Sequence, residues 1–214
     1  MIRKINIALV GNPNSGKSSL FNYLTGLKQQ VGNFPGVTVD KKTGACTLNS
    51  DQQATIIDLP GTYSLYPKSK DEGIVLDVLA NPANEWHPDV VVFIADATNL
   101  KRNLLLYTQV ADLKIPVIVA LNMMDLAKRS HIKIKVDELA AKLGVRVVPI
   151  SARKDEGIAE LKQAIAESGE FALQVDTLDF DELGIQNTLT AIQQKLAIAQ
   201  PYVALQVAHN YRQL

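Results

Sequence analysis

The chain has 214 residues, of which 47% are hydrophobic and 21% charged, and its formal net charge is zero. This composition is typical of a globular protein with a sizeable core and excludes an intrinsically disordered chain. The balanced charge excludes a global basic field, so we expect no nucleic-acid partner. The longest apolar runs, residues 90–95 and 115–121, are far shorter than the about 18 residues that span a bilayer. We therefore expect a soluble, cytosolic polypeptide, and its single cysteine, Cys46, cannot form an internal disulfide.

Apolar, β-rich runs alternate with stretches of helical periodicity over most of the chain. In chain order, strands are expected at residues 5–10, 37–48 (interrupted by Gly44), 54–58, 90–96, 117–121 and 146–150. Helices are expected at residues 17–27, 72–79, 101–113, 136–143 and 157–168, with Asn99 as the N-cap of the third. Several strands are apolar on both faces, which is typical of parallel strands covered by helices. The alternation predicts an α/β fold with a doubly wound, mostly parallel sheet.

The pattern changes after about Ser168. Residues 170–181 are acidic and mixed, and apolar residues then recur at helical spacing between Leu189 and Val207. Pro201 is expected to start a new helix or to kink the existing one. We therefore predict an α/β domain over residues 1–168 and a small all-helical subdomain over residues 169–214. The abrupt end of the chain, without a C-cap signal or a polar tail, suggests a fragment of a longer protein.

Four short segments occur in the order and at the spacing of a guanine-nucleotide site. Residues 11–18 match G-x-x-x-x-G-K-S, residues 58–61 match D-x-x-G, residues 122–125 match N-x-x-D, and Ser151-Ala152 follows the last expected strand. Each match alone is weak. All four in this order predict the fold of a P-loop GTPase, with GTP as the ligand and phosphoryl transfer to water as the reaction.

The first segment lies between a strand and a helix, which is the context that a phosphate-binding loop requires. Gly11 and Gly16 allow backbone N–H groups to approach a β-phosphate closely at the N-terminus of the following helix. Lys17 is expected to place its charge between the β- and γ-phosphates, and the Ser18 hydroxyl is expected to bind Mg²⁺. A glycine-rich turn without a ligand is the alternative interpretation.

The second segment supplies a candidate metal ligand and a candidate phosphate sensor. Asp58 is expected to hold Mg²⁺ through a water molecule, and the Gly61 N–H is expected to donate to the γ-phosphate and to lose that bond after hydrolysis. Residues 62–70 are therefore predicted to form a switch. Thr38, in a loop with two glycines and a proline, is the candidate for the second hydroxyl ligand of Mg²⁺, with an ordinary strand threonine as the alternative.

The third and fourth segments select the base. The carboxylate of Asp125 accepts two hydrogen bonds and therefore matches the N1–H and N2–H₂ donors of guanine but not the edge of adenine. Asn122 is expected to brace the loop, and the Ala152 N–H is expected to donate to guanine O6, with Ser151 shaping the turn. Alternatively, Asp125 is the N-cap of a helix from Leu126 onward.

The position after D-x-x-G holds Thr62. Small GTPases commonly have a glutamine there that orients the attacking water, and a threonine is too short to act in the same way. No arginine finger is evident in the sequence either. Hydrolysis therefore needs another source of positive charge, and we expect slow intrinsic turnover.

Taken together, these segments resemble the N-terminal cytosolic G domain of the FeoB family of bacterial ferrous-iron transporters. The resemblance rests on residues 11–17, 31–39, 58–65, 96–100 with 102–104, and 122–125. It covers residues 1–168 as a P-loop GTPase domain, and the rest of the chain is similar, with a weaker signature, to the family's helical linker subdomain. Residues 66–72 depart from the Ser/Thr-rich switch expected of the family, so no catalytic base is assigned there.

The resemblance implies a GTPase that regulates Fe(II) transport through its switch loops, at the cytoplasmic face of the bacterial inner membrane. The implied partners are GTP and GDP, a membrane domain of the full-length protein, small cytosolic accessory proteins of the iron-uptake system and further copies of the chain. Iron ligands are expected outside this chain. The resemblance also implies that Asn14 helps to hold K⁺, which would neutralise developing charge in place of an arginine finger. A turn residue in a left-handed conformation is the alternative role for Asn14.

The predicted site residues fall into three groups. The expected catalytic residues are Lys17, Asn14 and Gly61. The expected metal ligands are Ser18, Thr38 and, through water, Asp58 for Mg²⁺, and Asn14 for K⁺. The expected nucleotide-binding residues are Gly11, Asn14, Ser15, Gly16, Lys17, Ser18, Ser19, Thr38, Asp58, Gly61, Asn122, Met123, Asp125, Ser151, Ala152 and Arg153.

Two other interpretations stay open at this point. A free-standing GTPase that binds RNA or ribosomes would share G-x-P-N-x-G-K-S, although the net acidic residues 167–182 argue against an RNA-binding tail. A nucleotide-dependent scaffold would bind GTP without hydrolysing it, and Thr62 in place of glutamine is consistent with this alternative.

Overall fold

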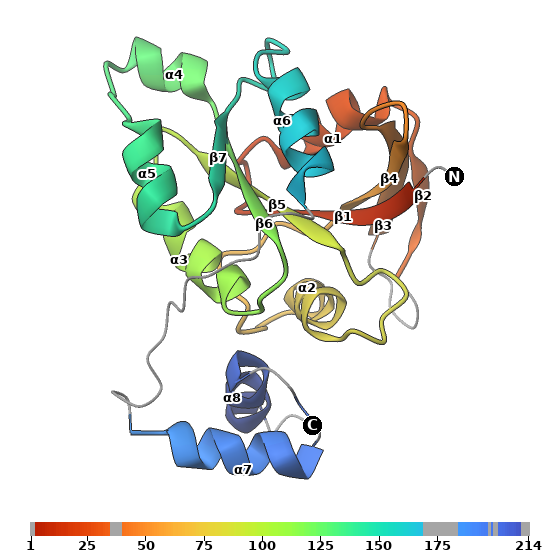
Figure 1. The fold of residues 1–214 in the computed structure, drawn as a ribbon, viewed down its shortest axis with the longest axis vertical. Helices are drawn as coiled ribbons and strands as arrows, with labels where there is room; N and C mark the ends of the chain where they lie inside the picture. Colours follow the sequence, from red (N-terminus) through yellow and green to blue (C-terminus); the bar gives the residue numbers. More distant parts are fainter. Residues whose placement is uncertain (1–2, 35–39, 169–183, 197, 199–200, 211–214) are drawn as a thin grey trace.

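The fold is built around one mixed β-sheet with helices on both of its faces (Figure 1). The computed structural model describes residues 3–34, 40–168, 184–196, 198 and 201–210. The strands are β1 (Arg3–Gly11), β2 (Gln30–Asn33), β3 (Asp40–Thr47), β4 (Gln52–Asp58), β5 (Val90–Asp96), β6 (Val117–Asn122) and β7 (Arg146–Pro149). The helices are α1 (Lys17–Thr25), α2 (Lys70–Ala80), α3 (Leu100–Ala111), α4 (Met124–Arg129), α5 (Val136–Leu143), α6 (Ile158–Ala166), α7 (Gln186–Leu196) and α8 (Pro201–Asn210).

The strand order in the sheet is β2-β3-β4-β1-β5-β6-β7. Strands β4, β1, β5, β6 and β7 are parallel, whereas β3 pairs with both β2 and β4 in antiparallel register. The connection from β4 to β5 passes beyond β1, so the winding of the chain reverses between β1 and β5. Ligands of such sheets bind beside the carboxyl ends of the strands at this reversal. The predicted doubly wound, mostly parallel α/β fold is confirmed.

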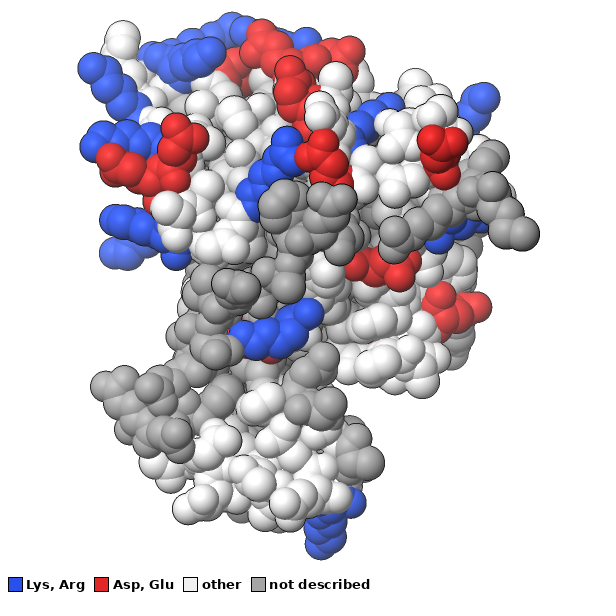
Figure 2. Space-filling view, in the orientation of Figure 1, with Lys and Arg blue, Asp and Glu red and all other residues white. Residues whose placement is uncertain are grey.

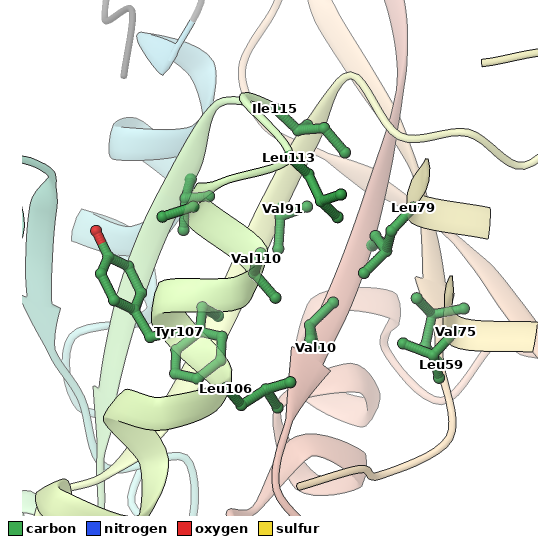
Figure 3. Close-up of a cluster of buried hydrophobic side chains, with 14 of the residues drawn as sticks. Val10, Leu59, Val75, Leu79, Val91, Leu106, Tyr107, Val110, Leu113 and Ile115 are labelled. Atoms are coloured by element: carbon green, nitrogen blue, oxygen red, sulfur yellow. The ribbon is translucent and has the colours of Figure 1, made fainter. Parts of the chain in front are cut away.

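The core consists of two apolar layers, one on each face of the sheet. Strands β5 and β6 are buried along nearly their whole length, so their side chains contribute to both layers. Helices α1 and α6 cover one face, and α2, α3 and α5 cover the other. Figure 3 shows the second layer, in which Val10 and Val91 of the strands meet Leu79 of α2 and Val110 of α3. This burial on both faces is the physical basis of the continuous apolar runs in the sequence.

Most predicted elements are present, with ends set by local backbone geometry. Helix α1 ends two residues before the expected position because Gly26 adopts a left-handed conformation at its C-cap. Helix α2 begins two residues early, where the Ser69 side chain accepts a hydrogen bond from the Glu72 N–H. Asn99 occupies the N-cap position of α3, but its side chain makes no capping hydrogen bond.

One short strand was not predicted, and one short helix was predicted only as an alternative, from Leu126 onward. Strand β2 is exposed along its whole length at the edge of the sheet and has no apolar alternation that would have revealed it. Helix α4 has only six residues and follows Met123, which adopts a left-handed conformation. The predicted strand 37–48 corresponds to β3 from Asp40 onward, and residues 37–39 lie outside the described residues.

The tail contains two helices, α7 and α8, among its described residues, and α8 begins at Pro201 as one of the two alternatives predicted. Tyr202 of α8 is 1% exposed and belongs to the same apolar cluster as α2 and α3, so the tail packs against that layer of the core (Figure 1). The boundary predicted between residues 168 and 169 borders residues 169–183, which lie outside the described residues, and stays a prediction. Among the described residues, no helix is both long and apolar enough to span a membrane.

The surface carries charges of both signs. On the face seen in Figure 2, Lys and Arg side chains are interspersed with Asp and Glu side chains over the α/β part. The described residues on this face therefore present no continuous basic surface of the kind that binds nucleic-acid backbones.

Candidate nucleotide-binding site

The four predicted segments meet at one edge of the sheet. Gly11 ends β1, Asp58 ends β4, Asn122 ends β6, and Ser151 follows β7. These strands are parallel, so their carboxyl ends lie together. Segments that are up to 140 residues apart in the chain (Gly11 and Ser151) therefore contribute to a single site.

The loop after β1 requires glycine at two positions. A Cβ on Gly11 would lie 2.7 Å from the Ile94 carbonyl oxygen, and a Cβ on Gly16 would lie 2.2 Å from Asn122 Nδ2. Gly16 also has φ of +88°, a left-handed conformation that disfavours any Cβ. The loop lines a cavity whose walls consist of Asn12, Pro13, Asn14, Gly16, Lys17, Ser18, Ser19 and Gly61. Backbone N–H groups at the start of α1 favour an anion in this cavity.

A second cavity lies beside the first and shares Lys17 and Ser18 with it. Lys17 Nζ forms an ion pair with Asp58 Oδ1, and both side chains are almost buried. Asp40 and Asp71 also line this cavity, and sequence reasoning did not identify either of them. The cavity therefore brings the Ser18 hydroxyl and the Asp58 carboxylate, hard oxygen donors of the kind that Mg²⁺ prefers, together with the ammonium groups of Lys17 and Lys42.

Asn122 connects three loops of the site. Its Nδ2 donates to the Ser15 carbonyl oxygen at 2.9 Å, and its Oδ1 accepts from the Ala152 N–H at 3.0 Å. Asn122 is 3% exposed, so both hydrogen bonds are shielded from water. The Ala152 N–H, which the sequence assigned to guanine O6, donates in this structure to Asn122.

Asp125 follows Asn122 in the same segment and is partly buried. It is in the first turn of α4, whose N-cap is Met123, so the alternative of Asp125 as a helix N-cap is wrong. Partial desolvation raises the pKa of Asp125, but the Ser151 hydroxyl, nearby backbone N–H groups and Lys154 outweigh it and hold the pKa below its ordinary value. The carboxylate is therefore ionised at neutral pH and available as a double acceptor.

Gly61 lies against the first loop. A Cβ at Gly61 would be 3.1 Å from the backbone of Pro13, and the next N–H, of Thr62, donates to the Gly11 carbonyl oxygen at 3.3 Å. Thr62 itself is 1% exposed, and its hydroxyl donates to the Ser64 carbonyl oxygen at 2.7 Å. The threonine at the position of the missing glutamine is thus used inside its own loop.

Four predicted site residues remain: Asn14, Arg153, Ser19 and Thr38. Asn14 has φ of +65°, the left-handed turn geometry that was its alternative role. Arg153 is exposed, and its carbonyl oxygen lies 3.5 Å from the Tyr23 hydroxyl as an acceptor. Ser19 is exposed on α1 beside the first cavity. Thr38 lies outside the described residues.

Comparisons with known proteins identify the family of the chain. Residues 5–165 match the family model described as ferrous iron transport protein B. The Fe(2+) transporter FeoB of Escherichia coli (strain K12) is 45% identical over 164 residues, which cover 77% of this chain and 21% of that protein. The chain thus spans about a fifth of the length of the curated relatives that it matches.

Solved structures give the same result. The cytosolic domain of the T. maritima FeoB iron transporter in a GDP form has a TM-score of 0.83 at 37% identity, covering 96% of this chain and 80% of that chain. An S. thermophilus NFeoB mutant bound to GDP has a TM-score of 0.77 at 39% identity, covering 99% and 79%. The FeoB G domain from Methanococcus jannaschii has a TM-score of 0.69 at 44% identity, covering 79% and 99%. The chain therefore belongs to the ferrous iron transport protein B (FeoB) family and corresponds to its GTPase-family G domain.

Proposed function

We propose that this chain binds GTP with Mg²⁺, hydrolyses it slowly to GDP and phosphate, and reports the state of the nucleotide through residues 62–70. The observation that carries the proposal is the Asn122 side chain, which joins the first loop to the Ser151-Ala152 loop. This connection sets the distance between a phosphate cavity and a base-binding loop. The structures of relatives solved with GDP support the same assignment.

Base selection is assigned to Asp125. The Asp125 carboxylate is ionised at neutral pH, and an ionised carboxylate accepts from both N1–H and N2–H₂ of guanine. Adenine offers an acceptor at N1, which would face the carboxylate unpaired. Met123, Ser151, Ala152 and Arg153 are assigned to shaping the pocket around the base.

Phosphate binding is assigned to the first loop, with Gly11, Ser15 and Gly16 supplying backbone and Lys17 the charge. In the structure Lys17 pairs with Asp58, so nucleotide binding must draw Lys17 toward the phosphates. Ser18 and Asp58, which line one cavity, fit Mg²⁺, and Thr38 is the proposed second hydroxyl ligand. When bound, Mg²⁺ would neutralise charge on the β- and γ-phosphate oxygens.

Charge stabilisation during hydrolysis is assigned to Lys17, to the Gly61 N–H and to K⁺ held with the help of Asn14. The Asn14 backbone is left-handed and its side chain is exposed at the rim of the phosphate cavity, which leaves the carboxamide oxygen available to a cation. K⁺ would supply the positive charge that an arginine finger gives other GTPases.

The whole protein's role is a further part of the proposal. The relatives, of which the matched residues cover 21%, are named Fe(2+) transporters, so we propose that this domain regulates Fe(II) transport by a membrane domain outside the chain, at the cytoplasmic face of the inner membrane. Small accessory proteins and further copies of the chain remain proposed partners. Among the described residues, no cluster of three or more His, Cys, Asp or Glu side chains could hold a metal ion.

The test is competition for a fluorescent GDP analogue, followed by phosphate release. GTP and GDP should displace the probe, ATP should not, and phosphate should appear only with GTP and Mg²⁺. Equal displacement by ATP would remove the proposed role of Asp125.

A nucleotide-dependent scaffold is the second candidate function. It is favoured by one observation: the Thr62 hydroxyl is engaged with Ser64 inside its loop and does not face the phosphate cavity. Tight GTP binding without release of phosphate in either K⁺ or Na⁺ would identify this function.

A further inference from the structure

Gln109 of α3 holds the segment that follows Gly61. Its Oε1 accepts a hydrogen bond from the Leu65 N–H at 2.8 Å and another from the Ser64 hydroxyl at 3.1 Å. No sequence motif pointed to Gln109, which lies 44 residues away from Leu65 in the chain. A single side-chain oxygen thus fixes two consecutive residues of the proposed switch.

The same segment is fixed at its other end by the sheet and the first loop. The Leu59 N–H donates to the Leu9 carbonyl oxygen at 3.4 Å, and the Thr62 N–H donates to that of Gly11 at 3.3 Å. Leu65 is fully buried in the layer formed with α2 and α3. Only residues 60–64 lie between the two buried leucines, and Gly61 is among them.

Further hydrogen bonds close this short segment on itself. The Ser64 hydroxyl accepts from the Tyr66 N–H at 3.1 Å, and Thr62 Oγ1 accepts from the Ser64 N–H at 3.2 Å. Ser64 therefore links Gln109 to both Thr62 and Tyr66. Loss of the Gln109 side chain would therefore remove hydrogen bonds that hold the residues next to Gly61 in place.

Helix α3 is a rigid support for this contact. Tyr107 and Val110, which flank Gln109, are buried in the core layer of Figure 3. The Tyr107 ring meets Phe93 of β5 edge to face, and its hydroxyl donates to the Leu143 carbonyl oxygen at 2.7 Å. Gln109 is therefore positioned by packing on both sides in sequence.

We propose that Gln109 is a positioning residue that holds Gly61 ready for the γ-phosphate and thereby sets the preference of the domain for GTP over GDP. This inference rests on the proposed function, in which the Gly61 N–H contacts the γ-phosphate. Without the anchor, residues 60–64 sample more conformations, and ordering them on the γ-phosphate weakens binding. GDP lacks that phosphate and depends on the first loop and on the Asn122 and Asp125 loop, so its affinity does not change.

Two variants separate the hydrogen bonds from the shape of the side chain. Gln109→Met keeps the length but removes the acceptor, whereas Gln109→Glu keeps an acceptor for both Ser64 and Leu65. Gln53→Met makes the same change at an exposed position on β4. The affinities of GDP and of a non-hydrolysable GTP analogue are measured for each, together with hydrogen exchange at the Leu65 amide.

Gln109→Met should bind the GTP analogue about tenfold more weakly, the factor expected from losing one or two net hydrogen bonds, with GDP affinity within twofold of wild type. The Leu65 amide should exchange faster in this variant. Gln109→Glu and Gln53→Met should behave as wild type in both measurements.

The inference is overturned if Gln109→Met keeps the wild-type ratio of the two affinities, or if both affinities fall equally, since equal loss marks a general structural role. Unchanged exchange at Leu65 would also overturn it. Failure of the proposed nucleotide binding gives a different result, because wild type itself would then bind neither nucleotide.

Discussion

Replacing Asn122 by alanine tests whether one side chain holds the nucleotide site together. The substitution removes the donor to the Ser15 carbonyl oxygen and the acceptor of the Ala152 N–H. Both backbone groups are buried around a residue that is 3% exposed, so water cannot easily replace the lost partner. The first loop and the loop after β7 would then lose the side chain that hydrogen-bonds to both of them.

The magnitude follows from the two unpaired groups. Each buried polar group that loses its partner costs about 1–3 kcal/mol, so the free energy of unfolding should fall by about 2–6 kcal/mol. For a chain of this size each kcal/mol corresponds to about 2–4 °C, so the unfolding temperature should fall by at least about 4 °C. GDP affinity should fall as well, because the phosphate cavity and the base loop lose their fixed spacing.

The assay is urea unfolding of the nucleotide-free protein, with Asn99→Ala as the control. Asn99 is exposed and makes no capping hydrogen bond, so its replacement should change the free energy of unfolding by less than about 0.5 kcal/mol. If Asn122→Ala unfolds as the control does, with an unchanged denaturant slope, the two hydrogen bonds do not connect the loops and the reasoning is refuted.

Three further predictions concern the two carboxylates of the site. Asp125→Asn replaces a double acceptor by a group that contains a donor, so guanine nucleotides should bind on the order of a hundredfold more weakly. A xanthine nucleotide has a carbonyl at C2 and should therefore gain affinity for this variant in the same competition assay. Because the pKa of Asp125 lies below its ordinary value of 3.8, its contribution to the free energy of unfolding should be complete above that pH and be lost only as the pH falls through the lower folded-state value. A difference in unfolding free energy between wild type and Asp125→Asn that already shrinks between pH 6 and pH 5 would contradict this. Asp58→Asn removes the ion pair with Lys17, so the variant should bind GDP at least as tightly as wild type in EDTA but more weakly than wild type in Mg²⁺. A loss of GDP affinity of equal size in both conditions would argue against Asp58 as a Mg²⁺ ligand.

Features that depend on burial were predictable from the sequence, since burial leaves a pattern. Strands β5 and β6 are buried on both faces and appear as continuous apolar runs, which placed their ends within one residue. Strand β2 is exposed throughout and left no such pattern. The structural need for glycine at positions 11 and 16 was also predictable, and the structure shows that a Cβ at either position would lie too close to neighbouring atoms.

Contacts between distant segments were not predictable from the sequence alone. Asp40 and Asp71 reach the metal-side cavity only because β3 and α2 begin beside it, and Gln109 meets Leu65 only because α3 packs next to the loop. The sequence suggested guanine O6 as the acceptor of the Ala152 N–H. Only the structure shows that this N–H donates to Asn122 Oδ1. Local spacing carries no information about which of these groups meet.

The most direct test of the central claim is the rate of GTP hydrolysis in K⁺ and in Na⁺ at matched ionic strength, for wild type and Asn14→Gly. Glycine tolerates the φ of +65° found at this position, so the variant removes the carboxamide without straining the loop. If K⁺ takes the place of an arginine finger, it should accelerate hydrolysis by wild type, and Asn14→Gly should bind GDP normally but not respond to K⁺. Equally slow hydrolysis by wild type in both salts, or a K⁺ response that survives in Asn14→Gly, would contradict this role of K⁺.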